Sequence, residues 1–313
     1  MHAPIITRTL VTPAPYMPQH SEHILVHRER KILFISTKKQ ASDSVAELAK
    51  ATNFFDKIII DTRPRFLNLL DWVQLRRMLR SRKFSRVYDL QTSQRTSFYF
   101  HILWPGPFPE WSGIAMGCSH PHKNINRNCM HTLDRQFEQL CIAGIKPIKK
   151  PNYSWVSQDT QKFQMPKKFA LLVPGSNINR RQKRWPVKCF GIIAEIITKS
   201  GLCPVIIGSE NDTRLAKEIV EIEPTCIDLT GKTSLPDLMS LAKAASLAIG
   251  NDTGPMHICA SIGCVSFVLF SDVSNPDLCA PRGKSVKIIK VNSLQNLSVK
   301  RVAKYILPFL YMN

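Results

Sequence analysis

Several patterns are missing from this chain of 313 residues, and each absence argues against a class of protein. No stretch approaches the ~18 uninterrupted apolar residues of a membrane-spanning helix. The start of the chain is interrupted by prolines and has no compact apolar region, so we expect no cleaved signal peptide. A GxGxxG fingerprint is absent, which makes a dinucleotide oxidoreductase a weak interpretation of this sequence.

Cysteines are present, but not in pairs or clusters. The nine cysteines include no CxxC pair and no Cys/His group at zinc spacing. An odd number of scattered thiols, several of them inside apolar runs, is typical of buried free cysteines in a reducing cytoplasm. We therefore predict a cytoplasmic protein with free thiols and no metal site. The thiols inside apolar runs are Cys189, Cys203, Cys226, Cys259 and Cys264.

The chain is strongly basic. With 43 Lys and Arg against 23 Asp and Glu, its formal net charge is +20, and the excess is spread over both halves. This balance suits a polyanionic partner such as nucleic acid, an anionic membrane face or a phosphorylated substrate. Composition does not choose among these partners, and a basic surface that serves only solubility is equally consistent with it.

The C-terminal half alternates short apolar strands with helical patterns. Continuous apolar runs separated by helices indicate a parallel sheet covered on both faces, which is a doubly wound α/β domain. The predicted strands are 169–173, 203–208, 226–229, 247–250 and 265–270, the last of which closes the series. The predicted helices are 187–199, 211–222, 234–245 and one that opens at Pro255.

The N-terminal half is less regular, but it predicts a second α/β domain. Its expected strands are 31–36, 57–61 and 86–91, with a helix near 42–51. Residues 66–83 form an amphipathic segment with a basic end, which is either a solvated face or a contact for an anionic membrane or acceptor. The predicted domains are 1–150 and 151–313, with a linker near 146–166.

Ligands in an open parallel sheet bind beyond the carboxyl ends of the strands. After the predicted strand 169–173 come Pro174, Gly175 and Ser176, and then a basic run that includes Lys183 and Arg184. A glycine lets the backbone approach a phosphate, a serine can donate to it, and cations offset its charge. The alternative interpretation is a common turn followed by solvated basic side chains.

Two further strand ends carry candidate ligands. One strand end leads into the start of a predicted helix, which is surrounded by Asp252, Thr253, Gly254 and His257. The free N–H groups and the positive dipole end of a helix start favour the binding of a diphosphate. Glu210 is placed to bind a ribose diol, and Asp252 to accept hydrogen bonds from sugar hydroxyls. Taken singly, Asp252 could be a helix N-cap and His257 a core histidine. Three such loops at one sheet edge together favour a binding site.

These motifs also carry a resemblance to a known family. In chain order, PGS, KRWP, GSEND, DLTGKTSLPDL and GNDTGPMH closely resemble the ADP-heptose:lipopolysaccharide heptosyltransferases, glycosyltransferase family 9. The resemblance is specific over 169–283 and weaker over 31–145, where VYDLQTSQRT is similar to the family's third N-terminal strand and loop. It implies a GT-B architecture, in which an acceptor-side and a donor-binding Rossmann-like domain face each other across a cleft.

The resemblance also implies roles for the strand-end residues. Ser176 and Lys183 would contact the donor phosphates or sugar, Glu210 the ribose, and Asp252 the heptose hydroxyls. The diphosphate would be held by Thr253, Gly254 and His257, and the implied donor site includes Pro174, Gly175 and Arg184. The family needs no metal or other cofactor, which agrees with the absence of a DxD-like motif near these loops.

One departure from the family concerns the start of the chain. The family's N-terminal domain begins with a strand that leads into a Gly-Asp loop, and that aspartate is the expected general base. Here the first glycine is Gly106, and the strand at 31–36 matches the family's second strand. We therefore expect the first β-α unit to be missing and leave the base unassigned. Asp89, His120 and His122 are weak substitutes, each more typical of a structural or acceptor-facing residue.

The expected reaction moves a heptose-like sugar from a nucleotide-diphosphate donor, such as ADP-heptose, to a lipid-linked, phosphorylated lipopolysaccharide acceptor at the cytoplasmic membrane face. An acceptor hydroxyl attacks the anomeric carbon, and Lys183, Ser176 and the helix start stabilise the charge on the departing diphosphate. Two alternatives stay open: a degenerate relative that only binds the nucleotide-sugar, and a basic nucleic-acid-binding protein. Composition alone supports the latter, since no helix-turn-helix, RRM or zinc-finger pattern is present; the family resemblance predicts no nucleic-acid partner.

Overall fold

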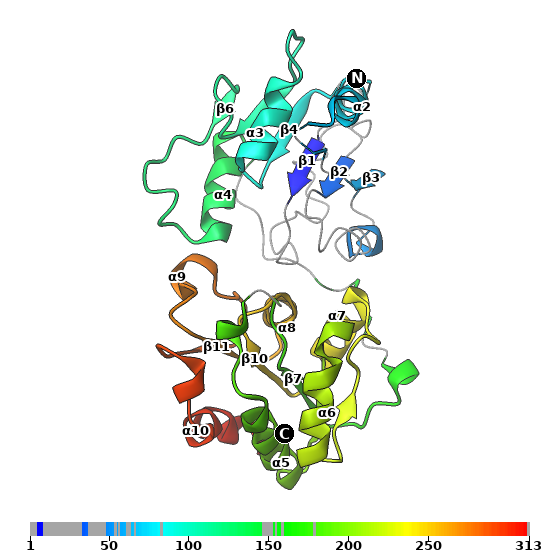
Figure 1. The fold of residues 1–313 in the computed structure, drawn as a ribbon, viewed down its shortest axis with the longest axis vertical. Coiled ribbons are helices and arrows are strands. Elements are labelled where there is room, and N and C mark those ends of the chain that lie inside the picture. Colours follow the sequence, from blue (N-terminus) through cyan, green and yellow to red (C-terminus); the bar gives the residue numbers. More distant parts are fainter. Residues whose placement is uncertain are drawn as a thin grey trace. The chain divides into compact units, whose positions relative to one another are not determined.

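The described residues form two compact units, which divide between Asn152 and Tyr153 in the computed structural model of the chain (Figure 1). Each unit has its own parallel sheet and its own core. Among the helices that the structure describes, none combines the length and apolar character needed to cross a bilayer. The structure describes residues 5–8, 33–36, 48–52, 55, 57–60, 64–65, 67–81, 84–145, 153, 155–157, 160–177 and 180–311.

The N-terminal unit is built on a six-stranded parallel sheet with the order β3-β2-β1-β4-β5-β6. The predicted strands at 31–36, 57–61 and 86–91 correspond to β2, β3 and β4. In chain order the strands are β1 (Ile5–Arg8), β2 (Leu33–Ser36), β3 (Lys57–Ile60), β4 (Arg86–Asp89), β5 (Glu110–Gly113) and β6 (His120–Pro121).

The first strand corrects one part of the prediction that this domain lacks its first β-α unit, because the strand is present. Ile5–Arg8 lies between β2 and β4, with Ile5 opposite Leu33 on one side and Val87 on the other. The sequence concealed the strand because its apolar stretch is only Ile5-Ile6, with polar residues and prolines around it. Residues 9–32, which connect β1 to β2, lie outside the described residues.

Three helices of this unit follow β3, β4 and β6: α2 (Leu69–Arg80), α3 (Gln94–His101) and α4 (Thr132–Ile142). Residues 48–51 are also helical, within the helix predicted near 42–51. Asn68 caps α2 by accepting from the Asp71 N–H, and Ser93 caps α3 in a capping box with Thr96. The helices α2 and α3 pack together, since the ring of Trp72 meets that of Phe98 edge-on at 4.9 Å.

The C-terminal unit repeats the same topology, with the strand order β12-β11-β10-β7-β8-β9. The prediction that the series closes with residues 265–270 is wrong, because β12 pairs in parallel with β11 at the edge of the sheet. The sequence VKIIK of β12 mixes lysines with apolar residues, as suits an edge strand. The strands are β7 (Phe169–Val173), β8 (Cys203–Ile206), β9 (Ile227–Asp228), β10 (Leu247–Asn251), β11 (Ser266–Phe270) and β12 (Val286–Lys290).

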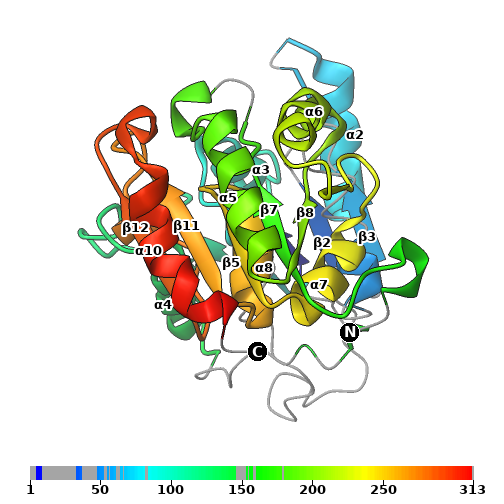
Figure 2. The ribbon, with the colours of Figure 1, turned by 90° about the horizontal axis from the view of Figure 1, so that it is seen from below.

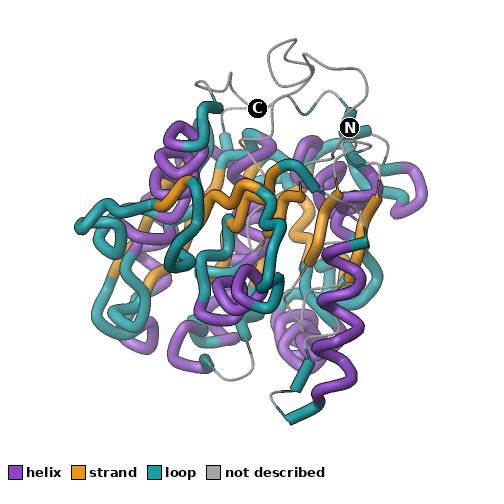
Figure 3. The backbone as a smooth tube through the Cα atoms, turned by 90° about the horizontal axis from the view of Figure 1, so that it is seen from above, coloured by secondary structure: helices purple, strands orange, loops and turns teal. Residues whose placement is uncertain are grey.

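Helices cover both faces of this sheet, as right-handed parallel crossovers require. Figure 1 shows β7, β10 and β11 between α8 on one side and α5 with α10 on the other, and Figure 2 shows α5 and α10 side by side. Strands and helices alternate along most of the described backbone (Figure 3). The helices are α5 (Val187–Lys199), α6 (Thr213–Ile222), α7 (Leu235–Ala244), α8 (Gly254–Ile262), α9 (Pro276–Cys279) and α10 (Val299–Leu310).

Two adjacent isoleucines of α5 test this packing. Ile193 is fully buried, whereas Ile192 is 42% exposed. We expect Ile193→Ala to lower the free energy of unfolding of the C-terminal unit by about 3 kcal/mol, because it leaves a cavity in the core. The matched Ile192→Ala variant should lose less than ~1 kcal/mol. Urea denaturation followed by circular dichroism compares the two, and equal losses would contradict the burial of this helix face.

Candidate functional site

Loops from four strands of the C-terminal sheet meet at its carboxyl edge. Because the strands are parallel, the segments that follow β7, β8, β10 and β11 lie along one border. The predicted strand-end residues Ser176, Glu210 and Asp252 come from three of these segments, and the loop after β11 adds Ser274. The sheet therefore delivers polar side chains from distant parts of the chain to one edge.

A buried ion pair occupies the centre of this edge. The Lys183 Nζ donates to the Asp252 Oδ2 at 2.5 Å and to the Ser274 Oγ at 2.7 Å. The Ser274 hydroxyl in turn donates to the same Asp252 oxygen at 2.7 Å. All three residues are less than a tenth exposed, so each charge is held by a specific partner rather than by water. The interpretation of Lys183 as a merely solvated side chain is therefore wrong.

The start of α8 lies next to this pair. The N-cap of α8 is Thr253, and no side chain caps the helix, so the interpretation of Asp252 as the N-cap is wrong. The buried His257, in the first turn of α8, places its Nε2 3.9 Å from the Asp252 Oδ1. With Gly254 as the first helical residue and Pro255, which has no N–H, as the second, this end offers the Gly254 N–H and a positive dipole end beside a buried cation.

The loop after β7 is held by a second basic residue. The Arg184 guanidinium donates to the Ser176 Oγ at 3.0 Å and to the Ser176 carbonyl at 2.8 Å. The Asp212 carboxylate lies 3.8 Å from the same guanidinium. A Cβ at Gly175 would lie 2.6 Å from that carboxylate, so any other residue at this position would displace the Asp212 side chain.

Sequence reasoning missed two residues that organise this edge. Asn251, the last residue of β10, donates to the Pro174 carbonyl at 2.7 Å and accepts from the Trp185 N–H at 3.0 Å. It therefore fixes the β7 loop and the segment around Lys183 to the end of β10. The other residue is Ser274, which lies in the loop after β11. Ligands in a parallel sheet bind beyond the carboxyl ends of the strands, so the loop after the predicted strand 265–270 could have been identified as a fourth candidate segment.

Glu210 lies apart from the ion pair. It is exposed, and its side chain lies beside Gly231, where a Cβ would come within 2.8 Å of the Glu210 Cγ. Gly231 also has a φ of 72°, which a glycine adopts without strain. The structure thus places Glu210 on the rim of the same edge, accessible from solvent, while Lys183, Asp252 and His257 lie inside.

In the N-terminal unit, Asp89 is completely buried at the end of β4. Its Oδ1 accepts from the Thr92 N–H at 2.9 Å, and the Thr92 hydroxyl accepts from the Arg127 guanidinium at 2.9 Å. Burial lowers the pKa of Arg127, and the charge of Asp89 opposes this shift. No sequence pattern pointed to Arg127, because it lies in a loop without regular structure.

The two candidate histidines differ in their surroundings. The side chain of His122 is fully enclosed, with its Nε2 3.6 Å from the Glu138 Oε1 and its Nδ1 3.5 Å from the Arg127 Nε. His120 is half-buried, and its Nδ1 lies 2.9 Å from the Ser119 Oγ. The structure therefore joins Asp89 and His122 through Thr92 and Arg127, and it leaves His120 outside this cluster.

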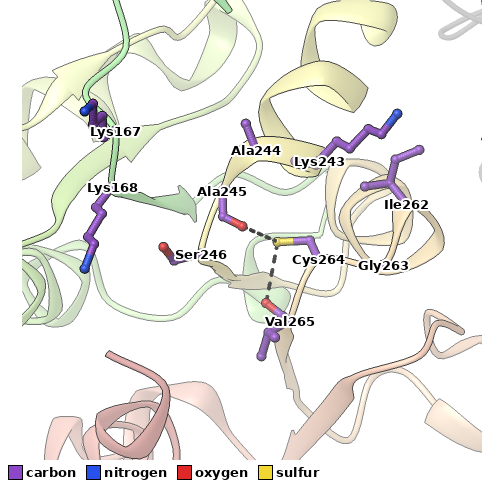
Figure 4. Close-up of a pocket in the computed structure, with 11 residues that line it drawn as sticks. Lys167, Lys168, Lys243, Ala244, Ala245, Ser246, Ile262, Gly263, Cys264 and Val265 are labelled. Carbon is purple, nitrogen blue, oxygen red and sulfur yellow. Dashed lines mark hydrogen bonds between the residues drawn. The ribbon is translucent and has the colours of Figure 1, made fainter. Parts of the chain in front are cut away.

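A hollow of about 500 Å³ lies elsewhere, at the amino-terminal ends of the C-terminal strands (Figure 4). It is lined by the segments before β7, β10 and β11, which include Lys167, Lys168, Lys243 and Cys264. Burial raises the pKa of the Cys264 thiol to about 12, so this thiol stays protonated. The hollow contains none of the predicted site residues and lies at the opposite edge of the sheet from them.

Among the residues that the structure describes, no group of three or more His, Cys, Asp or Glu is placed to hold a metal ion. The metal-independence implied by the family resemblance stays a prediction.

Comparison with known proteins adds a family match. The model of glycosyltransferase family 9 (heptosyltransferase) matches residues 131–306. A lipooligosaccharide heptosyltransferase 2 from Haemophilus influenzae is 27% identical over 173 residues, 51% of this chain and 49% of that protein. The Haemophilus ducreyi protein of the same name is 29% identical over 242 residues, 65% of this chain and 69% of that protein. The match thus spans about half the length of the first relative.

Solved structures resemble the whole chain. The Escherichia coli ADP-heptose lps heptosyltransferase II superposes with a TM-score of 0.77 at 18% identity, covering 99% of this chain and 98% of that one. The E. coli heptosyltransferase WaaC with ADP gives a TM-score of 0.71 at 16% identity, covering 99% and 100%. At this identity the likeness concerns the fold.

The buried ion pair predicts an asymmetric response to substitution. Lys183→Met removes the cation beside a buried carboxylate, so we expect it to lower the free energy of unfolding by about 3–5 kcal/mol. The double variant Lys183→Met/Asp252→Asn also removes the charge left behind, and it should be more stable than Lys183→Met. A double-mutant cycle measured by urea denaturation tests this coupling, and simply additive losses would refute it.

His122 predicts a pH dependence of stability. Burial lowers its pKa below the ordinary 6.5, with Glu138 opposing the shift and Arg127 adding to it. The unfolded chain therefore binds a proton at a higher pH than the folded chain does. This stabilising contribution should be complete above pH 6.5 and decline as the pH falls from 6.5 towards the folded pKa.

We expect His122→Gln to make the unfolding free energy of the N-terminal unit depend less on pH between 6.5 and the lowered pKa of His122. His101→Gln, at an exposed position on α3, is the matched control. Urea titrations over a pH series measure both, and an unchanged slope in His122→Gln would show that other groups govern this range.

Proposed function

Because this chain belongs to glycosyltransferase family 9 and has the GT-B fold of two Rossmann-like domains, we propose that it transfers a heptose from ADP-heptose to a lipopolysaccharide-core acceptor. The observation that carries the proposal is the buried Lys183–Asp252 pair beside the start of α8. It puts a cation, a carboxylate and a helix N-terminus together, which are the three features that a sugar diphosphate needs.

The names of the relatives support this choice of donor and acceptor. Solved structures with the same fold include WaaC with ADP and WaaC with ADP-2-deoxy-2-fluoro heptose. The matching curated relatives are lipooligosaccharide and lipopolysaccharide heptosyltransferases. These names support heptosyl transfer in the synthesis of the lipopolysaccharide core, and the choice of ADP-heptose belongs to the proposal.

Each strand-end residue has a role in the proposed donor site. Asp252 accepts hydrogen bonds from the sugar hydroxyls, and Lys183 offsets the charge of the diphosphate. Thr253 and Gly254 supply the helix end to the phosphate oxygens, with His257 beside them. On the rim, Glu210 binds the ribose diol. The Ser176 hydroxyl accepts from Arg184 and donates to the Arg180 carbonyl, so it donates to the phosphates only when it turns away from that carbonyl.

The proposed reaction is a displacement at the anomeric carbon. The acceptor hydroxyl attacks, the bond to the diphosphate breaks, and ADP leaves while Lys183 and the start of α8 stabilise the developing negative charge. A base must take the acceptor's proton. That base stays unassigned: Asp89 and His122 are enclosed, and His120 is half-buried at the end of the N-terminal sheet. The reaction as proposed uses no metal or other cofactor.

The two alternatives that the sequence left open gain nothing from these findings. The family match and the two-domain fold do not favour nucleic-acid binding, and no further observation favours a degenerate relative. We propose instead a lipid-linked, phosphorylated sugar as the acceptor, and a place of action at the cytoplasmic face of a membrane, where the net charge of +20 suits anionic partners.

Isothermal titration with ADP-heptose tests the donor site. We expect the wild-type chain to bind, and both Asp252→Ala and Lys183→Ala to weaken binding by at least tenfold, since each removes a charge-assisted contact worth roughly 1.5–3 kcal/mol. Lys217→Ala, an exposed lysine on α6, is the matched control and should bind like the wild type.

No heat of binding from a folded wild-type chain would remove ADP-heptose as the donor. Binding without turnover on a lipopolysaccharide-core acceptor would instead identify the degenerate relative.

A further inference from the structure

An apolar patch lies on the first two turns of α2 and on Leu67, which stands just before the N-cap residue Asn68. Leu67 is 89% exposed, Leu69 and Leu70 are each 74% exposed, and Val73 is 45% exposed. Phe98 of α3, at 42% exposed, extends the patch, because its ring lies 4.9 Å from that of Trp72 on α2. Four aliphatic side chains exposed within seven residues are far more than the isolated apolar residues of an ordinary surface.

Folding does not explain these leucines. The inner face of α2 is supplied by Leu75 and Leu79, both 6% exposed, which pack into the core of the unit. The start of the helix is already held by the Asn68 cap. The exposed leucines therefore contribute little to the stability of the described structure and remain available to a partner.

Basic side chains accompany the patch. Arg65, Arg77 and Arg80 are exposed, and Asp71 is the only acidic residue of α2. The Arg80 guanidinium donates to the Gly106 carbonyl, which holds its charge at the surface. Leucines next to arginines are typical of helices that lie in the interface of an anionic bilayer.

The topology places the patch at the functional edge of its own sheet. The helix α2 follows β3 and runs back to β4, so it begins at the carboxyl edge and ends at the amino edge. A contact confirms this placement: Arg95, at the start of α3, donates to the Pro64 carbonyl and lies over the Trp72 ring. The patch therefore shares an edge with Asp89 and Thr92.

We propose that Leu67, Leu69, Leu70 and Val73 insert into the interface of an anionic phospholipid bilayer, with Arg65 and Arg77 against the headgroups. The purpose of such docking rests on the proposed function, in which the acceptor is lipid-linked. Docking by α2 would bring the carboxyl edge of the N-terminal sheet to the surface from which such a lipid projects. A second copy is a poorer occupant, because its own arginines and net charge of +20 would face those of the first.

Vesicle sedimentation tests the proposal without any sugar transfer. The probes are vesicles of phosphatidylethanolamine with phosphatidylglycerol and vesicles of phosphatidylcholine alone. We expect the full chain to bind the anionic vesicles, and Leu69→Gln/Leu70→Gln to weaken that binding by about tenfold or more, as loss of two buried leucines implies.

Matched controls separate the patch from general charge. Ile192→Gln replaces a partly exposed apolar residue of the other unit and should bind like the wild type. Arg77→Glu should weaken binding to the anionic vesicles more than Lys217→Glu does, since both reverse an exposed charge but only Arg77 lies on α2. Because all these side chains are partly or fully exposed, the variants should keep the thermal midpoint of the wild type.

Unchanged vesicle binding by Leu69→Gln/Leu70→Gln would overturn the proposal. So would a wild-type dimer, seen by sedimentation velocity, that this variant dissociates, because the patch would then be covered by a second copy. A transfer assay distinguishes this result from failure of the proposed function. The leucine variant should keep its turnover on a delipidated, water-soluble acceptor and lose turnover on an acceptor embedded in vesicles. A wild-type chain that is inactive on both acceptors would refute the proposed function, but the result of the vesicle-binding assay would still hold.

Discussion

The buried pair of Lys183 and Asp252 is the constraint around which the carboxyl edge of the C-terminal sheet is arranged. The two residues are 69 positions apart in the sequence, yet their side chains meet at 2.5 Å. Removing two charges from water costs several kcal/mol, and the loss is offset only if each charge finds well-placed partners. Ser274 supplies one such partner to both residues. Buried ion pairs add little net stability over apolar residues, and the contacts of this one join the segments that follow β7, β10 and β11.

The neighbouring contacts follow from the same requirement. Lys183 reaches Asp252 only if the loop after β7 is held against the end of β10, and the Asn251 amide does this by bridging Pro174 and Trp185. Arg184 then points the other way, toward Ser176 and Asp212. Adjacent basic residues thus have separate tasks, one in the buried pair and one in the loop. The start of α8, which no side chain caps, is left facing this cluster.

The two units use one topology for different chemistry. In both sheets the first strand of the unit lies in the middle. In the N-terminal sheet β2 and β3 extend from it to one edge and β4, β5 and β6 to the other, and in the C-terminal sheet β8 and β9 extend to one edge and β10, β11 and β12 to the other. In the C-terminal unit the strand ends carry the ion pair and a helix start that no side chain caps. In the N-terminal unit the corresponding edge carries Asp89, Thr92 and Arg127 in a hydrogen-bonded chain, with the enclosed His122 beside it. Which substrate each edge binds belongs to the proposed function.

The parallel α/β class of both halves, most strands of the C-terminal sheet and the family could all be predicted from the sequence, because apolar runs and strand-end motifs are local signals. The sequence also identified Lys183, Asp252 and His257, which the structure brings together. It did not predict β1, whose short apolar stretch becomes a strand only between β2 and β4, or β12, whose lysines conceal an edge position. Three features became visible only in the folded chain: Ser274 completes the ion pair, Asn251 ties the loops together and Asp252 does not cap α8. These facts depend on side chains distant in sequence that meet at a sheet edge, and no local pattern encodes such a meeting.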